Sequence, residues 1–285
     1  MKLFLYRTLC GFFLGLSVFA PGFSGSIIAI IMGIYQDIIN IAANPFKKFK
    51  ENIIFCIPLV IGVLFSAIIF ILTFKFLFTH YEKATYLLFV GLIAGNLPVI
   101  IKEIKKHYWQ NWQKKYLIGG MITFFIALFL SIIATTINDN QGIHNISLLM
   151  LMISGFLGGS VAFIPGMSVS MVLIILGVYH ELISRAELLL RFDIRYLGFF
   201  IIFTLFACLG IIITSNGIKY VFEKYYTLAN VLVLGFMSGS LLGILFKTTQ
   251  MNNINFNWML GIVMLCLGLA ISATFILLAN INKKY

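Results

Sequence analysis

Charged residues are scarce in this chain, and their scarcity argues against a soluble fold. Only 10% of its 285 residues are Asp, Glu, Lys or Arg, whereas 61% are hydrophobic. An average soluble domain is about 25% charged, and a soluble domain of this size cannot keep so much apolar surface away from water. Lipid as the surrounding medium removes this conflict. The composition therefore predicts an integral membrane protein.

Cysteine and histidine are also few, and their positions argue against metal sites and catalysis. The four cysteines have neither the spacing of a metal site nor the setting of a disulfide framework. The four histidines fall in expected loops or helix ends, without the Arg and Asp partners that an intramembrane lipid phosphatase would need. We therefore expect no catalytic residue, no cofactor and no metal, and hence a protein that is not an enzyme.

Long apolar runs recur along the chain, and most approach the ~18–20 residues that a helix needs to cross a bilayer. The net charge of +11 comes largely from short loops between these runs, such as the loop holding Lys47, Lys48 and Lys50. Basic loops of this kind are typical of the cytoplasmic side of a membrane. They do not indicate a nucleic-acid partner, and the expected surroundings are membrane lipids.

The chain repeats itself at an offset of 144 residues. Residues 11–39 and 155–183 are identical at 13 of 29 positions, including positions occupied by Gly, Pro, Ser and Tyr, which rarely match by chance. The same offset pairs Gly91 with Gly235 and Gly95 with Gly239. This pattern predicts an internal duplication. It also indicates that residues 1–20 are retained, although they resemble a cleaved signal peptide, because the same pattern recurs deep in the chain.

Each half begins with an interrupted apolar element. The interruptions contain Pro21-Gly22 and Pro165-Gly166, and proline and glycine favour a break in a helix at such places. We expect an all-α polytopic membrane protein with two inverted repeats, each a re-entrant hairpin followed by three transmembrane helices. The first repeat covers 1–140, with a hairpin at 9–40 and helices at 53–76, 85–101 and 116–137. The second covers 141–285, with a hairpin at 147–183 and helices at 197–215, 228–246 and 257–280.

The distribution of basic residues favours re-entrant hairpins over single crossings. With re-entrant hairpins, fourteen Lys or Arg residues lie on the side of both termini and six on the other side, as the positive-inside rule requires. Three crossings per half then invert the second half relative to the first, and both termini are cytoplasmic. The basic cluster of Arg185, Arg191 and Arg195 falls outside, where neighbouring acids would neutralise it: Glu181, Glu187 and Asp193.

Paired breaks in inverted halves are the best sequence indication of a transporter's binding site. Non-helical backbone at membrane depth requires cover from protein or a water-filled cavity, and exposed amides together with serine hydroxyls can hold an anion. A plain kink is the alternative for one such motif, but two related copies favour binding. The expected site residues are Pro21, Gly22, Ser24, Gly25, Ser26, Pro165, Gly166, Ser168, Val169 and Ser170, together with Asn96 and Ser240, which lie beside close-packing Gly-x-x-x-Gly pairs.

At these motifs the chain resembles the polyprenyl-phosphate (undecaprenyl-phosphate) transporter family of bacteria. The resemblance rests on Pro21-Gly22-x-Ser24-Gly25 and Pro165-Gly166-x-Ser168-x-Ser170, each followed by Gly-x-Tyr, and the duplication extends it over nearly the whole chain. Four positions depart from the family pattern: Val18 stands where an acid is usual, Ser26-Ile27 replace Gly-Thr, and Val169 replaces Gly.

The resemblance implies a flippase in the bacterial cytoplasmic membrane that returns undecaprenyl phosphate, or a similar polyprenyl phosphate, for reuse in cell-envelope synthesis. Its headgroup would enter a polar cavity between the halves while its prenyl tail stays in lipid. A transporter or channel for a small anion, using the same paired hairpins, is the alternative. The direction of transport, coupling to a proton or another ion, and assembly into a homo-oligomer are left open.

Overall fold

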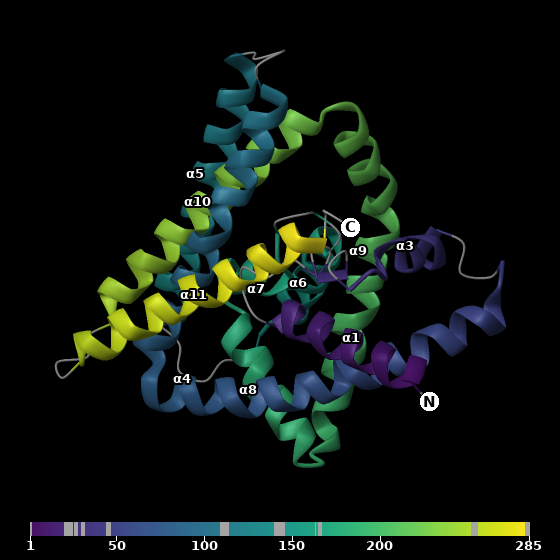
Figure 1. Ribbon diagram of the computed structural model, residues 1–285. Coiled ribbons are helices and arrows are strands. Elements are labelled where there is room, and N and C mark those ends of the chain that lie inside the picture. The colour runs from purple at the N-terminus through teal and green to yellow at the C-terminus, as the bar shows by residue number, and fades with distance from the viewer. Residues whose placement is uncertain are drawn as a thin grey trace.

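The computed structural model describes residues 2–19, 25, 28–29, 32–43, 47–108, 114–139, 146–162, 164, 167–251 and 256–282. Every regular element in these ranges is a helix (Figure 1). The helices are α1 (Lys2–Phe19), α3 (Tyr35–Ala43), α4 (Phe49–Tyr108), α5 (Lys114–Asp139), α6 (Leu148–Val161), α7 (Val169–Ile175), α8 (Tyr179–Leu190), the 3₁₀ turn η1 (Ile194–Tyr196), α9 (Leu197–Lys224), α10 (Tyr226–Gln250) and α11 (Trp258–Asn282). The predicted all-helical class is confirmed for this part of the chain.

Among the described residues, four helical segments are long and apolar enough to cross a membrane: Phe49–Lys105, Tyr116–Ile133, Ile194–Thr214 and Tyr226–Gln250. A fifth crossing exists if α7 and α8, which are bent by 115° relative to each other, count as one broken span. Three shorter apolar helices accompany them: Leu3–Ser17, Leu148–Val161 and Trp258–Thr274. These lengths confirm the prediction of a multi-pass membrane protein.

Helix α4 holds two of the predicted transmembrane helices in one element. It is 60 residues long, far more than one crossing needs, and Tyr81 within it has a non-helical backbone (φ −140°, ψ 42°). Figure 1 shows α4 running along the lower edge of the molecule and then turning upward. The predicted ranges 53–76 and 85–101 lie on either side of this bend, so the chain turns back at Tyr81 without a loop.

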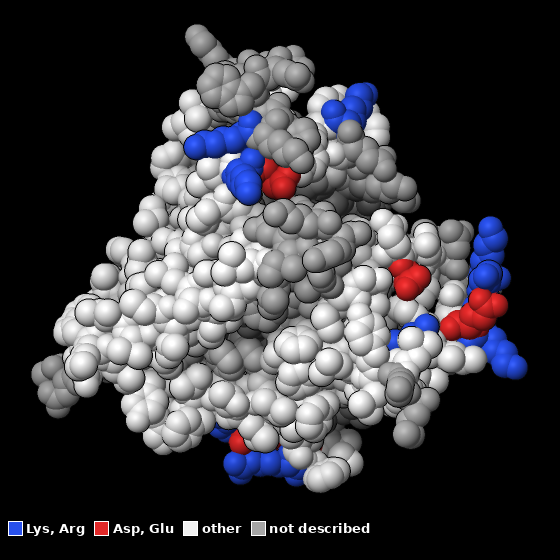
Figure 2. All heavy atoms as spheres, in the orientation of Figure 1, with Lys and Arg blue, Asp and Glu red and all other residues white. Residues whose placement is uncertain are grey.

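The outward surface of these helices is apolar. Large hydrophobic side chains on α4, α5, α9 and α11 are more than half exposed, among them Phe65, Phe129, Ile212 and Met259. Figure 2 shows Lys, Arg, Asp and Glu near the top, along the right side and at the bottom of the visible face, whereas the described surface on the left and in the centre is uncharged. In water this surface would aggregate, whereas in a bilayer it faces hydrocarbon.

Glycines bring the helices into backbone contact. A Cβ atom on Gly91 would overlap the carbonyl oxygen of Leu265 in α11, and one on Gly239 would overlap the carbonyl oxygen of Phe124 in α5. Small residues at such positions let membrane helices approach closely. The predicted close packing at the two Gly-x-x-x-Gly pairs is therefore confirmed. It joins the last helix of each predicted half to the other half, α11 to α4 and α5 to α10.

The packing of α1 on α4 resembles the packing of α6 on α9. A Cβ atom on Gly11 would overlap the carbonyl oxygen of Leu59, while one on Gly155 would lie 2.6 Å from the carbonyl oxygen of Phe203. Both members of the second pair lie 144 residues beyond those of the first. The interrupted elements of the two predicted halves therefore contact their first long helices through equivalent residues.

Candidate substrate site at the helix breaks

The second interrupted element is broken at the predicted place. Helix α6 ends at Val161 and α7 begins at Val169, and both are too short to cross a bilayer alone. They pack closely, because a Cβ atom on Gly158 would lie 3.1 Å from Cγ1 of Val169. The predicted range 147–183 also contains a second break, after α7, so its last residues belong to α8.

The segment after each break ends in the same turn. Gly33 and Gly177 both have positive φ, 66° and 74°, a backbone conformation that favours glycine. The amide of Ile34 donates to the carbonyl of Ala29 at 3.0 Å, and the amide of Val178 donates to that of Leu173 at 3.0 Å. These are the hydrogen bonds of a glycine helix cap, and they set the direction in which α3 and α8 leave.

Ser168 occupies the N-cap position of α7 with extended backbone (φ −123°, ψ 140°). Its hydroxyl does not cap the helix. Instead the Oγ atom of Ser168 lies 2.7 Å from that of Ser170 and donates to the carbonyl oxygen of Ser17 at 3.4 Å. Since α7 has only seven residues, its dipole is small and the hydroxyls supply most of the polarity here.

Ser17 lies beside segments of both interrupted elements, near Gly25 of the first and Ser168 of the second. The sequence did not predict it as a site residue. Ser17 lies in the last turn of α1, and its Oγ atom would be 3.0 Å from a Cβ atom on Gly25, beyond the first break. Its own hydroxyl donates to the carbonyl of Leu14 at 2.6 Å. The repeat gave no signal for Ser17, because its counterpart is Val161. The sequence feature that could have indicated Ser17 is its position, as a polar residue four positions before Pro21.

We name Ser17, Gly25, Ser168 and Ser170 the serine cluster. Its three serines are at most 3% exposed, and α7 lies in the middle of the bundle (Figure 1). The apolar side chains of Met167 and Met171 are buried around it. Buried hydroxyls in an apolar setting are strong hydrogen-bonding groups because little water competes with them.

The other predicted site residues divide into two groups. Asn96 and Ser240 donate to carbonyls of their own helices, Asn96 to Leu92 at 2.8 Å and Ser240 to Met237 at 2.9 Å, and their role in binding stays a prediction. The remaining predicted residues lie outside the described part of the chain: Pro21, Gly22, Ser24, Ser26, Pro165 and Gly166.

A buried carboxylate links α8 to α4 beside the second break. Glu187 is 3% exposed, accepts a hydrogen bond from Lys75 of α4 and pairs with Arg191 at 2.7 Å. The predicted pairing of Arg185, Arg191 and Arg195 with neighbouring acids is confirmed here, and again by the ion pairs Arg185–Glu181 and Arg195–Asp193. Lys75 is therefore held by a specific acid as well as lying near a helix end.

Lys75→Met is expected to lower the free energy of unfolding by about 1–3 kcal/mol, because the buried Glu187 loses one of two charged partners. The midpoint of thermal unfolding in detergent measures the change. Lys102→Met, an exposed lysine of the same helix, is the matched control and should leave the midpoint unchanged. Adding Glu187→Gln to Lys75→Met should restore part of the lost free energy of unfolding, because it removes the buried charge. Equal midpoints for both lysine variants would contradict this role of Lys75.

With this geometry described, comparison with known proteins identifies the family. Residues 14–259, most of the chain, match the VCA0040-like family, described as undecaprenyl phosphate translocase-like. The chain belongs to this family of undecaprenyl phosphate translocases. It is a transporter family and not an enzyme family, as the sequence predicts.

A relative shares the length of the chain as well as its family. The chain is 27% identical over 270 residues to the polyprenyl-phosphate transporter of Staphylococcus aureus (strain NCTC 8325 / PS 47), and the match covers 93% of each protein. No solved structure matches the chain significantly. The family match includes the positions of both predicted helix breaks.

Proposed function

We propose that this protein carries undecaprenyl phosphate, or a similar polyprenyl phosphate, across the bacterial cytoplasmic membrane and so recycles the lipid carrier for cell-envelope synthesis. The observation that carries the proposal is the serine cluster, where the ends of two broken elements bring buried hydroxyls together inside an apolar bundle. A phosphate crossing bare hydrocarbon faces a desolvation cost of many kcal/mol, and hydroxyl donors at this depth would lower it. The prenyl tail stays in lipid throughout.

An inverted two-fold architecture belongs to this proposal. Residues 1–140 and 141–285 form the two halves, each with a re-entrant hairpin and three crossings. Support comes from contacts that recur at the 144-residue offset: Gly11 on Leu59 and Gly155 on Phe203, and the paired glycine caps at Gly33 and Gly177. An inverted pair places the two breaks at the same depth from opposite faces, which suits alternating access.

The orientation follows from charge. The segments 47–50 and 102–115, with three and five lysines, carry the densest basic residues and are assigned to the cytoplasm with both termini. The end that holds α8 and Arg195 then faces outward. Each of its three arginines is paired with a neighbouring acid. Acidic residues contribute little to the positive-inside rule, so the orientation rests on the lysine-rich segments.

Vesicles test the proposal directly. The protein is reconstituted with labelled undecaprenyl phosphate, and the label accessible to a membrane-impermeant reagent is followed over time. We expect headgroup movement well above that in empty vesicles, and no uptake of labelled inorganic phosphate or chloride in vesicles without prenyl lipid. Anion uptake without headgroup movement would favour the small-anion alternative and overturn the lipid as cargo.

A further inference from the structure

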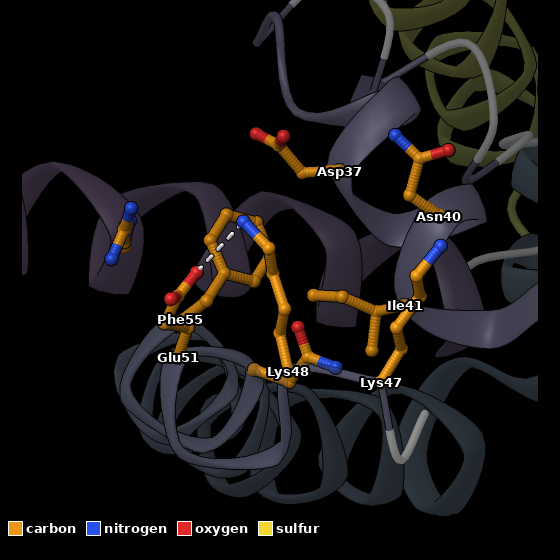
Figure 3. Close-up of a pocket in the computed structure, with 9 residues that line it drawn as sticks. Asp37, Asn40, Ile41, Lys47, Lys48, Glu51 and Phe55 are labelled. Carbon is orange, nitrogen blue, oxygen red and sulfur yellow. Dashed lines mark ion pairs between the residues drawn. The ribbon is translucent and has the colours of Figure 1, made fainter. Parts of the chain in front are cut away.

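A second polar site is formed by the beginnings of α1 and α4 together with α3. A cavity of about 500 Å³ opens between the beginning of α1, the helix α3 and the beginning of α4 (Figure 3). Three cationic side chains line it, Arg7, Lys47 and Lys48, and the ring of Phe55 forms an apolar part of its wall. We name this cavity the α3 pocket.

Arg7 is positioned in the α3 pocket by an aromatic ring and not by an acid. Its guanidinium carbon lies 4.7 Å from the centre of the Phe55 ring, and Phe55 is itself buried. Stacking on a ring fixes the plane of a guanidinium and leaves its edge donors available to a ligand. Within the described ranges Arg7 makes no ion pair.

The two lysines of the pocket are also available to an anion. Figure 3 shows the Lys47 amine extending towards Asn40, and Lys47 makes no ion pair among the described residues. Lys48 pairs with Glu51 at 3.3 Å, but both side chains are about 70% exposed (68% and 72%). An exposed pair of this kind contributes about 0–1 kcal/mol, so an incoming anion can replace it.

The second predicted half contains a similar stack of a guanidinium on a phenylalanine ring, in which the arginine is already paired with an acid. Phe199 lies 144 residues after Phe55 and likewise has a guanidinium over its ring, that of Arg185 at 4.3 Å. There, however, Arg185 is paired with Glu181. In the α3 pocket the guanidinium comes from α1 rather than from the helix after the glycine cap, and among the described residues it makes no ion pair, which leaves it available to a ligand.

The surroundings of the pocket favour a lipid over a soluble anion. Leu5 and Leu9 on α1 and Ile54 and Ile57 on α4 are 48–71% exposed beside it, so apolar, lipid-facing surface adjoins the cations. A ligand with a phosphate and a hydrocarbon chain can satisfy both at once. Asp37 in the lining limits the net positive charge, which suits a site that must release its ligand.

We infer that the α3 pocket binds the phosphate group of a phosphorylated lipid at the membrane surface on the side of the N-terminus. It serves as the docking subsite from which the headgroup exchanges with the serine cluster, and in this it rests on the function proposed above. Arg7 and Lys47 contact the phosphate, and Phe55 holds Arg7 in place. The cations raise the local concentration of anionic headgroups at this end of the path.

The test separates binding from transport. Binding of a short-chain prenyl phosphate to the purified protein in detergent is measured for wild type, Arg7→Gln/Lys47→Gln and the matched control Lys50→Gln, an exposed lysine in the first turn of α4 outside the pocket. We expect the double variant to weaken binding about ten-fold or more and Lys50→Gln to leave it unchanged. Raising the salt concentration should weaken binding to wild type more than binding to the double variant.

Two further arms identify the source of the phosphate and the role of the site. Inorganic phosphate at the same concentration should not compete, because it lacks the chain that contacts the apolar rim; equal competition would overturn the lipid as ligand. In vesicles the double variant should need more lipid for half-maximal transport while its maximal rate stays near wild type. Equal binding by the double variant and Lys50→Gln would contradict the α3 pocket as a binding site. If wild type bound the lipid but transported none, the proposed function would be wrong and the binding site would stand.

Discussion

Ser168→Ala/Ser170→Ala is expected to slow the movement of polyprenyl phosphate in vesicles about 10–100-fold. A hydrogen bond to a charged group contributes about 1.5–3 kcal/mol, and about 1.4 kcal/mol corresponds to a factor of ten. The two hydroxyls lie 2.7 Å apart and would contact the same phosphate, so their losses should not simply add. The initial rate of headgroup exposure, at equal amounts of reconstituted protein, measures the effect.

The matched control for this variant is Ser238→Ala. Ser238 is half-buried in α10 and donates to the carbonyl of Leu234 at 2.8 Å, one turn back in its own helix, so its loss should leave the rate near wild type. Ser168→Thr keeps a hydroxyl and should retain more activity than Ser168→Ala. A monodisperse elution profile shows that each variant is folded. Equal rates for the double variant and Ser238→Ala would remove the serine cluster from the mechanism.

Gly91→Ala is expected to destabilise the protein by about 1–3 kcal/mol, the usual cost of forcing an extra carbon into a packed interface. The new Cβ atom would overlap the carbonyl oxygen of Leu265, a backbone atom that cannot move aside as a flexible side chain can. Helices α4 and α11 must therefore separate. The midpoint of thermal unfolding in detergent, and the yield of folded protein from membranes, should both fall.

Gly198→Ala is the control for this prediction. Gly198 lies in the first turn of α9, and nothing is within 4 Å of the position that its Cβ atom would take. Alanine has the higher helix propensity, so this change should be neutral or stabilising by up to about 1 kcal/mol. If Gly91→Ala and Gly198→Ala gave the same midpoint, the close contact of α4 with α11 would not contribute to stability.

Several features of this protein could be predicted because they depend on local chemistry. Apolar runs imply helices in lipid, since backbone groups there must bond within their own segment. The break before Ser168 follows from Pro165-Gly166, and the close packing at Gly91 and Gly239 follows from the absence of a side chain. The pairing of the outer arginines with acids four positions away also follows from helical spacing.

Other features depend on which distant segments meet. Ser17 was missed because it becomes part of a polar cluster only when α7 packs against the end of α1. The partner of Lys75 lies 112 residues away on α8, and no pattern along either helix indicates it. The α3 pocket was missed for the same reason, because its cations come from the beginning of α1 and the loop before α4.

The sequence by itself therefore determined the medium, the helical class and the break before Ser168, because each of these follows from composition or from neighbouring residues. Only the tertiary structure decided that α5 packs on α10 and α11 on α4, and that Ser17, Ser168 and Ser170 share one buried cluster. The physical reason is that apolar helices in lipid have many nearly equivalent partners. Close contacts at a few glycines and hydroxyls select among them, and those contacts exist only after the helices have packed.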